Sequence, residues 1–114
     1  MSWDRDTPAR RVDLPEPGLF RMRLRRGGPW TACRITCDGG MWQAWVNDIP
    51  QGPESADPWR VAGLERIWTS AETIDTTEYH HLRRLHAWAI RYAPWHPAAN
   101  PSQPYDPGTA RPRF

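Results

Sequence analysis

The positions of the thirteen prolines limit which part of this chain can form regular structure. Three prolines stand before residue 18 and six after residue 93, and each removes a backbone hydrogen-bond donor and fixes φ at about −65°. We therefore expect an irregular N-terminal arm over residues 1–17, a single folded domain over residues 18–93 and an extended, proline-rich tail over residues 94–114. A total of 114 residues is near the usual size of one domain.

The first half of the predicted domain carries the two-residue alternation of β-strands. Apolar and basic side chains alternate over residues 19–25, which predicts a half-buried strand whose outward side chains are Arg21, Arg23 and Arg25. A glycine-rich turn leads to a second predicted strand over residues 30–37. The Asp-Gly-Gly sequence that follows predicts a hairpin into a third strand over residues 41–47.

The middle of the chain carries weaker signals. Residues 48–58 contain three prolines and read as a loop, and residues 59–61 and 64–68 are short apolar runs that we interpret as two further strands. So few residues predict a compact antiparallel sheet of four or five short strands, which curls into a small partial barrel or a bent meander.

A helix over residues 76–93 has clear start and stop signals. Asp75 is a good N-cap, Glu78 completes a capping box, Ile74 can pack on Tyr79, and Pro94 ends the helix. At about 100° per residue the apolar arc contains Tyr79, Leu82, Leu85, His86, Trp88, Ala89, Ile90, Tyr92 and Ala93. The opposite arc, predicted to face solvent, contains Arg83, Arg84 and Arg91. The predicted class is α+β: a small curled antiparallel sheet packed by one C-terminal helix.

The charged residues are unevenly distributed along the chain. All fifteen basic residues are arginine, and the net charge is only +2. Residues 18–37 hold five arginines and no acid, residues 38–78 hold two arginines and eight acids, and residues 79–114 hold five arginines and one acid. This pattern favours a surface with separate positive and negative regions, although a solvated charged face is the common explanation.

The two cysteines and the absence of long apolar runs bear on location. On a straight strand Cys33 and Cys37 would lie about 13 Å apart, beyond the ~4.4–6.8 Å between Cα atoms that a disulfide allows. We expect both to be small buried side chains without a bond between them. No apolar run approaches the ~20 residues of a membrane span, and the first residues lack the pattern of a signal peptide. We expect a cytoplasmic protein that does not enter a membrane.

Several short motifs match a known group of sequences. They are Pro17-Gly18, Arg26-Gly27-Gly28-Pro29-Trp30, Ile67-Trp68, Glu78-Tyr79, Ala87-Trp88-Ala89 and the segment Asn100-Pro101 to Pro104. Over most of residues 17–106 the chain resembles short uncharacterised proteins from bacteriophages and prophages of proteobacteria, a group without an assigned activity. The resemblance implies an accessory protein of a mobile element that acts inside a bacterial host cell.

Candidate metal and catalytic sites are incomplete. Glu78 and His81 have the spacing of one element of a di-iron site, but the chain predicts only one helix where such a site needs several. Cys33, Cys37 and His96 would make a partial zinc set, with thiolates too far apart on one strand. No nucleophile elbow, phosphate-binding loop or dinucleotide fingerprint is present. We expect no enzymatic activity, no cofactor and no metal ion.

The eight tryptophans separate into core and surface candidates. Large rings help a small domain build its core, and this is our interpretation of Trp68, Trp88 and one of Trp42 and Trp45. Three other tryptophans lie beside turns or in the proline-rich tail, and we predict that they are exposed and form an interface. They are Trp30, Trp59 and Trp95.

Two functions remain open from the sequence. The first is a non-catalytic phage or prophage accessory protein that binds a bacterial host protein or complex, such as an inhibitor of host defence of the anti-CRISPR kind. The second is a small nucleic-acid-binding module, in which both arginine faces contact phosphates and Trp30 stacks on a base. The low net charge argues against the second. The sequence leaves the oligomeric state open.

Overall fold

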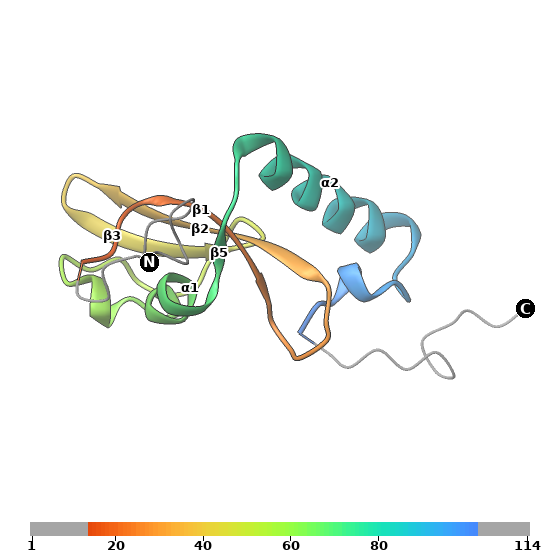
Figure 1. Cartoon of the computed structure of the whole chain (residues 1–114), viewed down its shortest axis with the longest axis horizontal. Helices are drawn as coiled ribbons and strands as arrows, with labels where there is room; N and C mark the ends of the chain where they lie inside the picture. Colours follow the sequence, from red (N-terminus) through yellow and green to blue (C-terminus); the bar gives the residue numbers. More distant parts are fainter. Residues whose placement is uncertain (1–13, 103–114) are drawn as a thin grey trace, which may run out of the picture.

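The strands of the computed structural model, which describes residues 14–102, pair in the order β4-β3-β2-β1-β5. Every pairing is antiparallel. The strands are β1 (Gly18–Arg23), β2 (Trp30–Asp38), β3 (Met41–Val46), β4 (Ile49–Pro50) and β5 (Glu72–Thr73). The helices are α1 (Leu64–Ser70) and α2 (Thr76–Tyr92), with short 3-10 helices η1 (Pro58–Arg60) and η2 (Pro97–Ala99). The sheet is open, and the predicted α+β class with a C-terminal helix on the sheet is confirmed (Figure 1).

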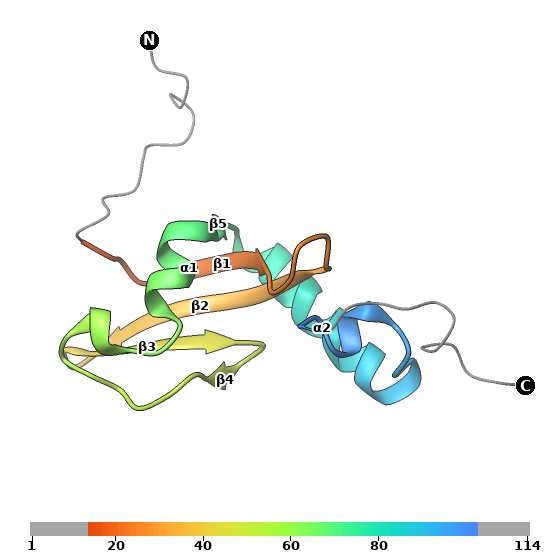
Figure 2. The ribbon, with the colours of Figure 1, turned by 90° about the horizontal axis from the view of Figure 1, so that it is seen from below.

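The two faces of the sheet are covered by different helices (Figure 1, Figure 2). The first face packs against α1 in a core that contains Phe20, Met22, Cys33, Ile35, Leu64, Ile67 and Trp68. The second face packs against α2 in a smaller cluster formed by Ala32, Tyr79 and Leu82, with Leu19, Trp30 and Ile74 against it. Consecutive residues of a strand point to opposite faces, so the alternation read from the sequence is confirmed.

The predicted hairpin forms between β2 and β3. Gly39 and Gly40 have φ of 61° and 83°, which is the left-handed region that a two-residue hairpin turn needs at both positions. A second turn of the same kind joins β3 to β4, where Asn47 and Asp48 have φ of 52° and 62°. The prediction of a loop throughout residues 48–58 is therefore wrong at β4, which pairs with the end of β3.

The two strands predicted after this loop do not form. The segment instead makes η1, where Asp57 accepts a hydrogen bond from the backbone of Trp59, and then α1. Leu64, Ile67 and Trp68 have the three- and four-residue spacing of one helix face, and this face is buried against the sheet. This segment forms a helix because a helix places all three side chains in the core. A strand would point some of them away from it.

The helix predicted at residues 76–93 is confirmed as α2. Asp75 Oδ1 accepts a hydrogen bond from the backbone N–H of Glu78 at 2.8 Å, and Ile74 packs in the same cluster as Tyr79. The Glu78 carboxylate accepts a hydrogen bond from Arg21 at 2.7 Å. Among the described residues only the Asp75 half of the predicted capping box is therefore present.

The second half of α2 extends past the sheet (Figure 1), and its predicted core arc is too wide. Leu82 and Ala89 are buried, but the side chains of Trp88, Ile90 and Tyr92 are 47%, 55% and 63% exposed. The core interpretation of Trp88 is therefore wrong, because no strand lies beneath this part of the helix.

The chain after α2 folds back on the helix. η2 lies beside α2, where the backbone carbonyl of Ala98 is 2.7 Å from Nδ1 of His86, and Ala98 is 5% exposed. The prediction of an extended tail is therefore wrong over residues 94–102. The tail beyond this point and the first thirteen residues lie outside the described part of the chain.

Candidate functional site

The arginines of β1 surround the ring of Trp30. The guanidinium carbons of Arg21 and Arg23 lie 4.2 and 4.1 Å from the centroid of that ring. Trp30 is paired with Arg23 across the β1–β2 ladder and is half-buried. The prediction that Trp30 is exposed is therefore wrong, because the two guanidinium groups cover the indole through cation–π contacts.

Arg21 is also held by two carboxylates. It donates to Glu72 from Nη2 and to Glu78 from Nη1, each at 2.7 Å. The hydrogen bond to Glu72 is the largest effect that raises the pKa of Arg21. Arg21 therefore ties β1 to β5 and to the first turn of α2, and its charge is already neutralised inside the molecule.

The other two arginines of this predicted face differ from Arg21. Arg25 is partly buried and donates to the backbone carbonyl of Arg26 at 3.4 Å, while its Nε is buried without a partner among the described residues. Arg23 is exposed and has no acidic partner within the described part of the chain. Neither Arg23 nor Arg25 is paired with an acid in the described part of the chain, and Arg23 is the more exposed of the two.

The arginine stripe predicted on α2 is divided in the same way. Arg83 is not a free surface side chain: its Nε donates to Asp48 Oδ2 at 2.9 Å, and only 24% of the side chain is exposed. Arg84 and Arg91 are exposed, and neither has an ion-pair partner in the described residues. The predicted solvent-facing stripe is therefore reduced to these two.

Asp48 collects three side chains where the β3–β4 turn meets α2. Its carboxylate accepts a hydrogen bond from Tyr79 Oη at 2.6 Å, in addition to the one from Arg83, and lies 3.5 Å from Arg34 Nε. Burial raises the pKa of Asp48, but these hydrogen bonds and the charges of the two arginines outweigh it and lower the pKa. The cluster is a structural clamp between turn and helix.

The predicted surface tryptophans Trp59 and Trp95 are both exposed, at 40% and 39%. Trp59 lies on η1 beside α1, and Trp95 follows the end of α2, so the two belong to opposite ends of the molecule (Figure 1). They cannot form one continuous interface together with Trp30.

Trp95 does belong to a surface that the sequence did not predict. Trp88 and Tyr92 are four residues apart and lie on one side of α2, and the ring of His96 packs edge-on against Trp88 with 5.7 Å between centroids. We name residues 88–96 the C-terminal aromatic segment. Its exposed rings are next to the exposed charge of Arg91, whose guanidinium lies 5.5 Å from the Tyr92 ring.

The described residues offer no metal site and no membrane-spanning helix. Within residues 14–102 no three His, Cys, Asp or Glu side chains are grouped so that they could hold a metal ion. No helix in this same part of the chain has both the length and the apolar character needed to cross a membrane. Comparisons with protein-family models, with curated proteins and with solved structures found no match.

Proposed function

We propose that this chain is a non-catalytic binding protein that docks on another protein through its C-terminal aromatic segment. The observation that carries the proposal is the exposure of Trp88, Tyr92 and Trp95, at 47%, 63% and 39%, within nine residues of each other. Tryptophan, tyrosine and arginine dominate the residues that contribute most to protein–protein binding. The exposed Arg84 and Arg91 lie on the same helix and supply charge at the rim of such an interface.

We base the class of partner on the sequence resemblance to phage and prophage proteins. It supports a protein or complex of the bacterial host as the target, in the cytoplasm, and the corresponding role is inhibition of a host defence system, as anti-CRISPR proteins perform.

A nucleic-acid target has less support from the same geometry. Electrostatic binding of phosphates needs arginines whose charge is not already neutralised. Arg21 and Arg83, one from each predicted arginine face, are paired with carboxylates inside the molecule. The other predicted phosphate contacts, Arg23, Arg25, Arg84 and Arg91, have no acidic partner among the described residues, but they are divided between the end of β1 and α2.

Affinity capture from a bacterial lysate tests the proposal when it compares matched variants. Wild type and Trp59→Ala, which truncates a ring that is 40% exposed at the other end of the molecule, are expected to recover the same stoichiometric protein. Trp88→Ala combined with Tyr92→Ala is expected to lose it, since truncation at a binding hot spot costs about 2 kcal/mol or more. Both rings are exposed, so the double variant is expected to retain its fold by circular dichroism.

Two outcomes would contradict the proposal. One is recovery of the same partner by the double variant as by wild type. The other is the loss of all captured proteins after nuclease treatment. That result would favour the nucleic-acid-binding alternative.

A further inference from the structure

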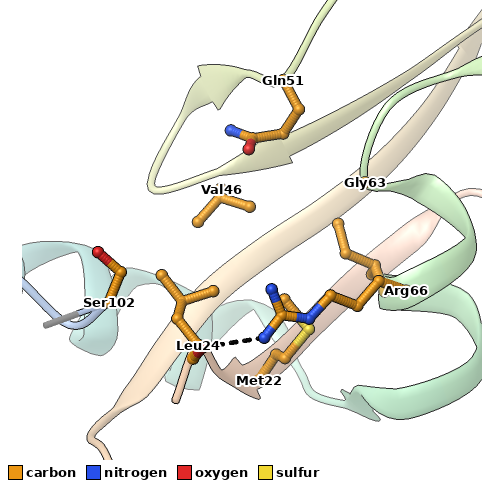
Figure 3. A pocket seen from close by; sticks show the side chains of 8 residues that line it. Met22, Leu24, Val46, Gln51, Gly63, Arg66 and Ser102 are labelled. Carbon is orange, nitrogen blue, oxygen red and sulfur yellow. Dashed lines mark hydrogen bonds between the residues drawn. The ribbon is translucent and has the colours of Figure 1, made fainter. Parts of the chain in front are cut away.

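A cavity of about 330 Å³ lies on the α1 face of the sheet. Its volume is at the lower end of the range of ~300–1,000 Å³ that small-molecule sites occupy. Figure 3 shows its wall: Ser102, which follows η2, lies on one side, and the other sides come from β1, β3, the segment after β4 and α1. Because these elements are held together by the main core, the cavity is part of the folded structure.

The lining of the cavity combines apolar side chains with the polar side chains of Gln51, Arg66 and Ser102. Its apolar lining consists of Met22, Leu24, Val46 and Ile67, of which Met22 and Ile67 are themselves core residues. The guanidinium of Arg66 and the amide of Gln51 face the same space (Figure 3). A molecule that fits must therefore combine an apolar part with a group that a guanidinium binds.

Arg66 is held in place by the backbone. Its Nη2 donates to the carbonyl oxygen of Leu24 at 2.9 Å, which fixes the guanidinium against the edge of the sheet (Figure 3). A guanidinium has five N–H donors, so one bond leaves four for a ligand. No carboxylate of the described residues pairs with Arg66. The guanidinium is therefore oriented by Leu24 and is not paired with an acid from residues 14–102.

We propose that this cavity binds a small amphipathic monocarboxylate, with its apolar chain against Met22, Leu24, Val46 and Ile67 and its carboxylate on Arg66. A guanidinium binds a carboxylate with two parallel hydrogen bonds, which one group with free donors can supply. A single arginine beside four apolar side chains suits one negative charge and an alkyl chain. None of the lining residues belongs to the C-terminal aromatic segment, so this proposal and the proposed function can fail independently.

The test uses hexanoate and hexanol, which share an alkyl chain and differ in charge, and acetate, which has the charge without the chain. Titration followed by amide chemical shifts is expected to show that wild type binds hexanoate more tightly than hexanol and binds acetate more weakly than either. The shifted amides are expected to surround Val46 and Arg66. Equal affinity for hexanoate and hexanol, or shifts located elsewhere, would overturn the proposal.

Two charge-matched variants separate the role of Arg66 from the loss of any positive charge. Arg66→Gln is expected to weaken hexanoate binding about tenfold or more, as removal of a hydrogen bond to a charged group does, and to leave hexanol binding unchanged. Arg60→Gln makes the same change at a side chain that is 81% exposed on η1, and is expected to match wild type. Equal effects of the two variants on hexanoate would refute a carboxylate site at Arg66.

A third variant tests the apolar wall. Val46→Phe adds a ring on the lining and is expected to weaken hexanoate and hexanol together. If this variant does not fold, the comparison of Arg66→Gln with Arg60→Gln still decides, because both replace exposed side chains. A folded Val46→Phe protein that binds both ligands as wild type does would place the ligand outside the cavity.

Discussion

Asp48 connects the β3–β4 turn to both α2 and β2. It is at the second position of a tight turn, in a left-handed conformation that aspartate tolerates better than most residues. Its carboxylate receives Tyr79 and Arg83 from α2 and faces Arg34 from β2. One side chain thereby fixes where the helix lies on the sheet.

Tyr79 is the most buried residue of this cluster, at 7% exposed. Burial, the hydrogen bond to Asp48 and its negative charge raise the pKa of Tyr79 to about 12. Tyr79→Phe removes only the donated hydrogen bond and leaves Asp48 with one partner fewer. We expect a loss of about 1–3 kcal/mol in the free energy of unfolding, measured by urea denaturation.

Tyr92→Phe is the matched control for that variant, since this ring is 63% exposed and its hydroxyl has no hydrogen bond among the described residues. We expect it to change stability by less than about 0.5 kcal/mol. Equal effects of the two substitutions would show that the Tyr79–Asp48 bond does not stabilise the fold.

The cluster also predicts a dependence of stability on pH. The pKa of Asp48 is lowered in the folded state, so the unfolded chain takes up the proton first as the pH falls. The stability that its charge contributes is present above the unfolded pKa of about 3.9 and is lost as the pH falls through the folded pKa. Asp48→Asn keeps a residue that accepts the left-handed conformation and removes the charge.

We expect the difference in unfolding free energy between wild type and Asp48→Asn to be largest near neutral pH and to shrink below about pH 4. Urea denaturation across this range measures it. Asp38→Asn, on a carboxylate with no partner in the described part of the chain, is expected to show no such trend. A difference that stays constant with pH would contradict an ionic role for Asp48.

At the scale of elements, the sequence predicts β1, β2, β3 and α2. Each of these elements is determined by residues that are close together in the sequence. Alternation defines the strands, and Asp75 and Pro94 bound the helix. α1 was missed because it has only seven residues, too few to be stable alone. It exists because Leu64, Ile67 and Trp68 are buried against β-strands distant in sequence, and that packing is not visible in a short window.

The β2–β3 hairpin gives a prediction at this scale. Gly39 has φ of 61°, and a Cβ added there would meet nothing within 4 Å, so backbone conformation alone decides what is tolerated. We expect Gly39→Asn to be neutral or to stabilise by up to about 1 kcal/mol, because asparagine accepts this conformation and has fewer unfolded states. We expect Gly39→Val to destabilise by about 1–3 kcal/mol.

Thermal or urea unfolding of both variants measures this contrast at one position. A valine variant as stable as the asparagine variant would show that the turn relaxes to a conformation with negative φ.

At the scale of the whole molecule, the fold consists of a well-buried sheet and a helix that it only partly covers. The sequence shows that α2 is amphipathic, but not how far along its length the sheet extends beneath it. The exposure of Trp88 and Tyr92 could therefore not be read from the periodicity of the helix. The same holds for Arg21 and Arg83, whose carboxylate partners are distant in sequence.

This uneven coverage predicts uneven stability. Ala32 and Cys33 of β2 are each fully buried, one on each face, whereas the last turns of α2 contact mainly η2. We expect the amides of β2 to exchange with solvent only when the whole protein unfolds, and those near Ile90 to exchange through local opening at lower free energy. Native-state hydrogen exchange measures both.

Uniform exchange free energies over β2 and the end of α2 would show that this helix end is stabilised as strongly as the core. In that case the C-terminal aromatic segment would be a rigid surface, and ordering it on a partner would cost no conformational entropy.

The two cysteines, four residues apart on β2, face different surroundings. Both are free, but Cys33 is fully buried, and burial raises the pKa of its thiol to about 12, whereas Cys37 is exposed, contrary to the expectation that both are buried. Since the thiolate is the reactive form, Cys37 is the thiol that accepts a maleimide dye, a spin label or a tether. The β2–β3 end that carries it is remote from the end of α2 (Figure 1), so a labelled or immobilised protein leaves the aromatic rings unobstructed.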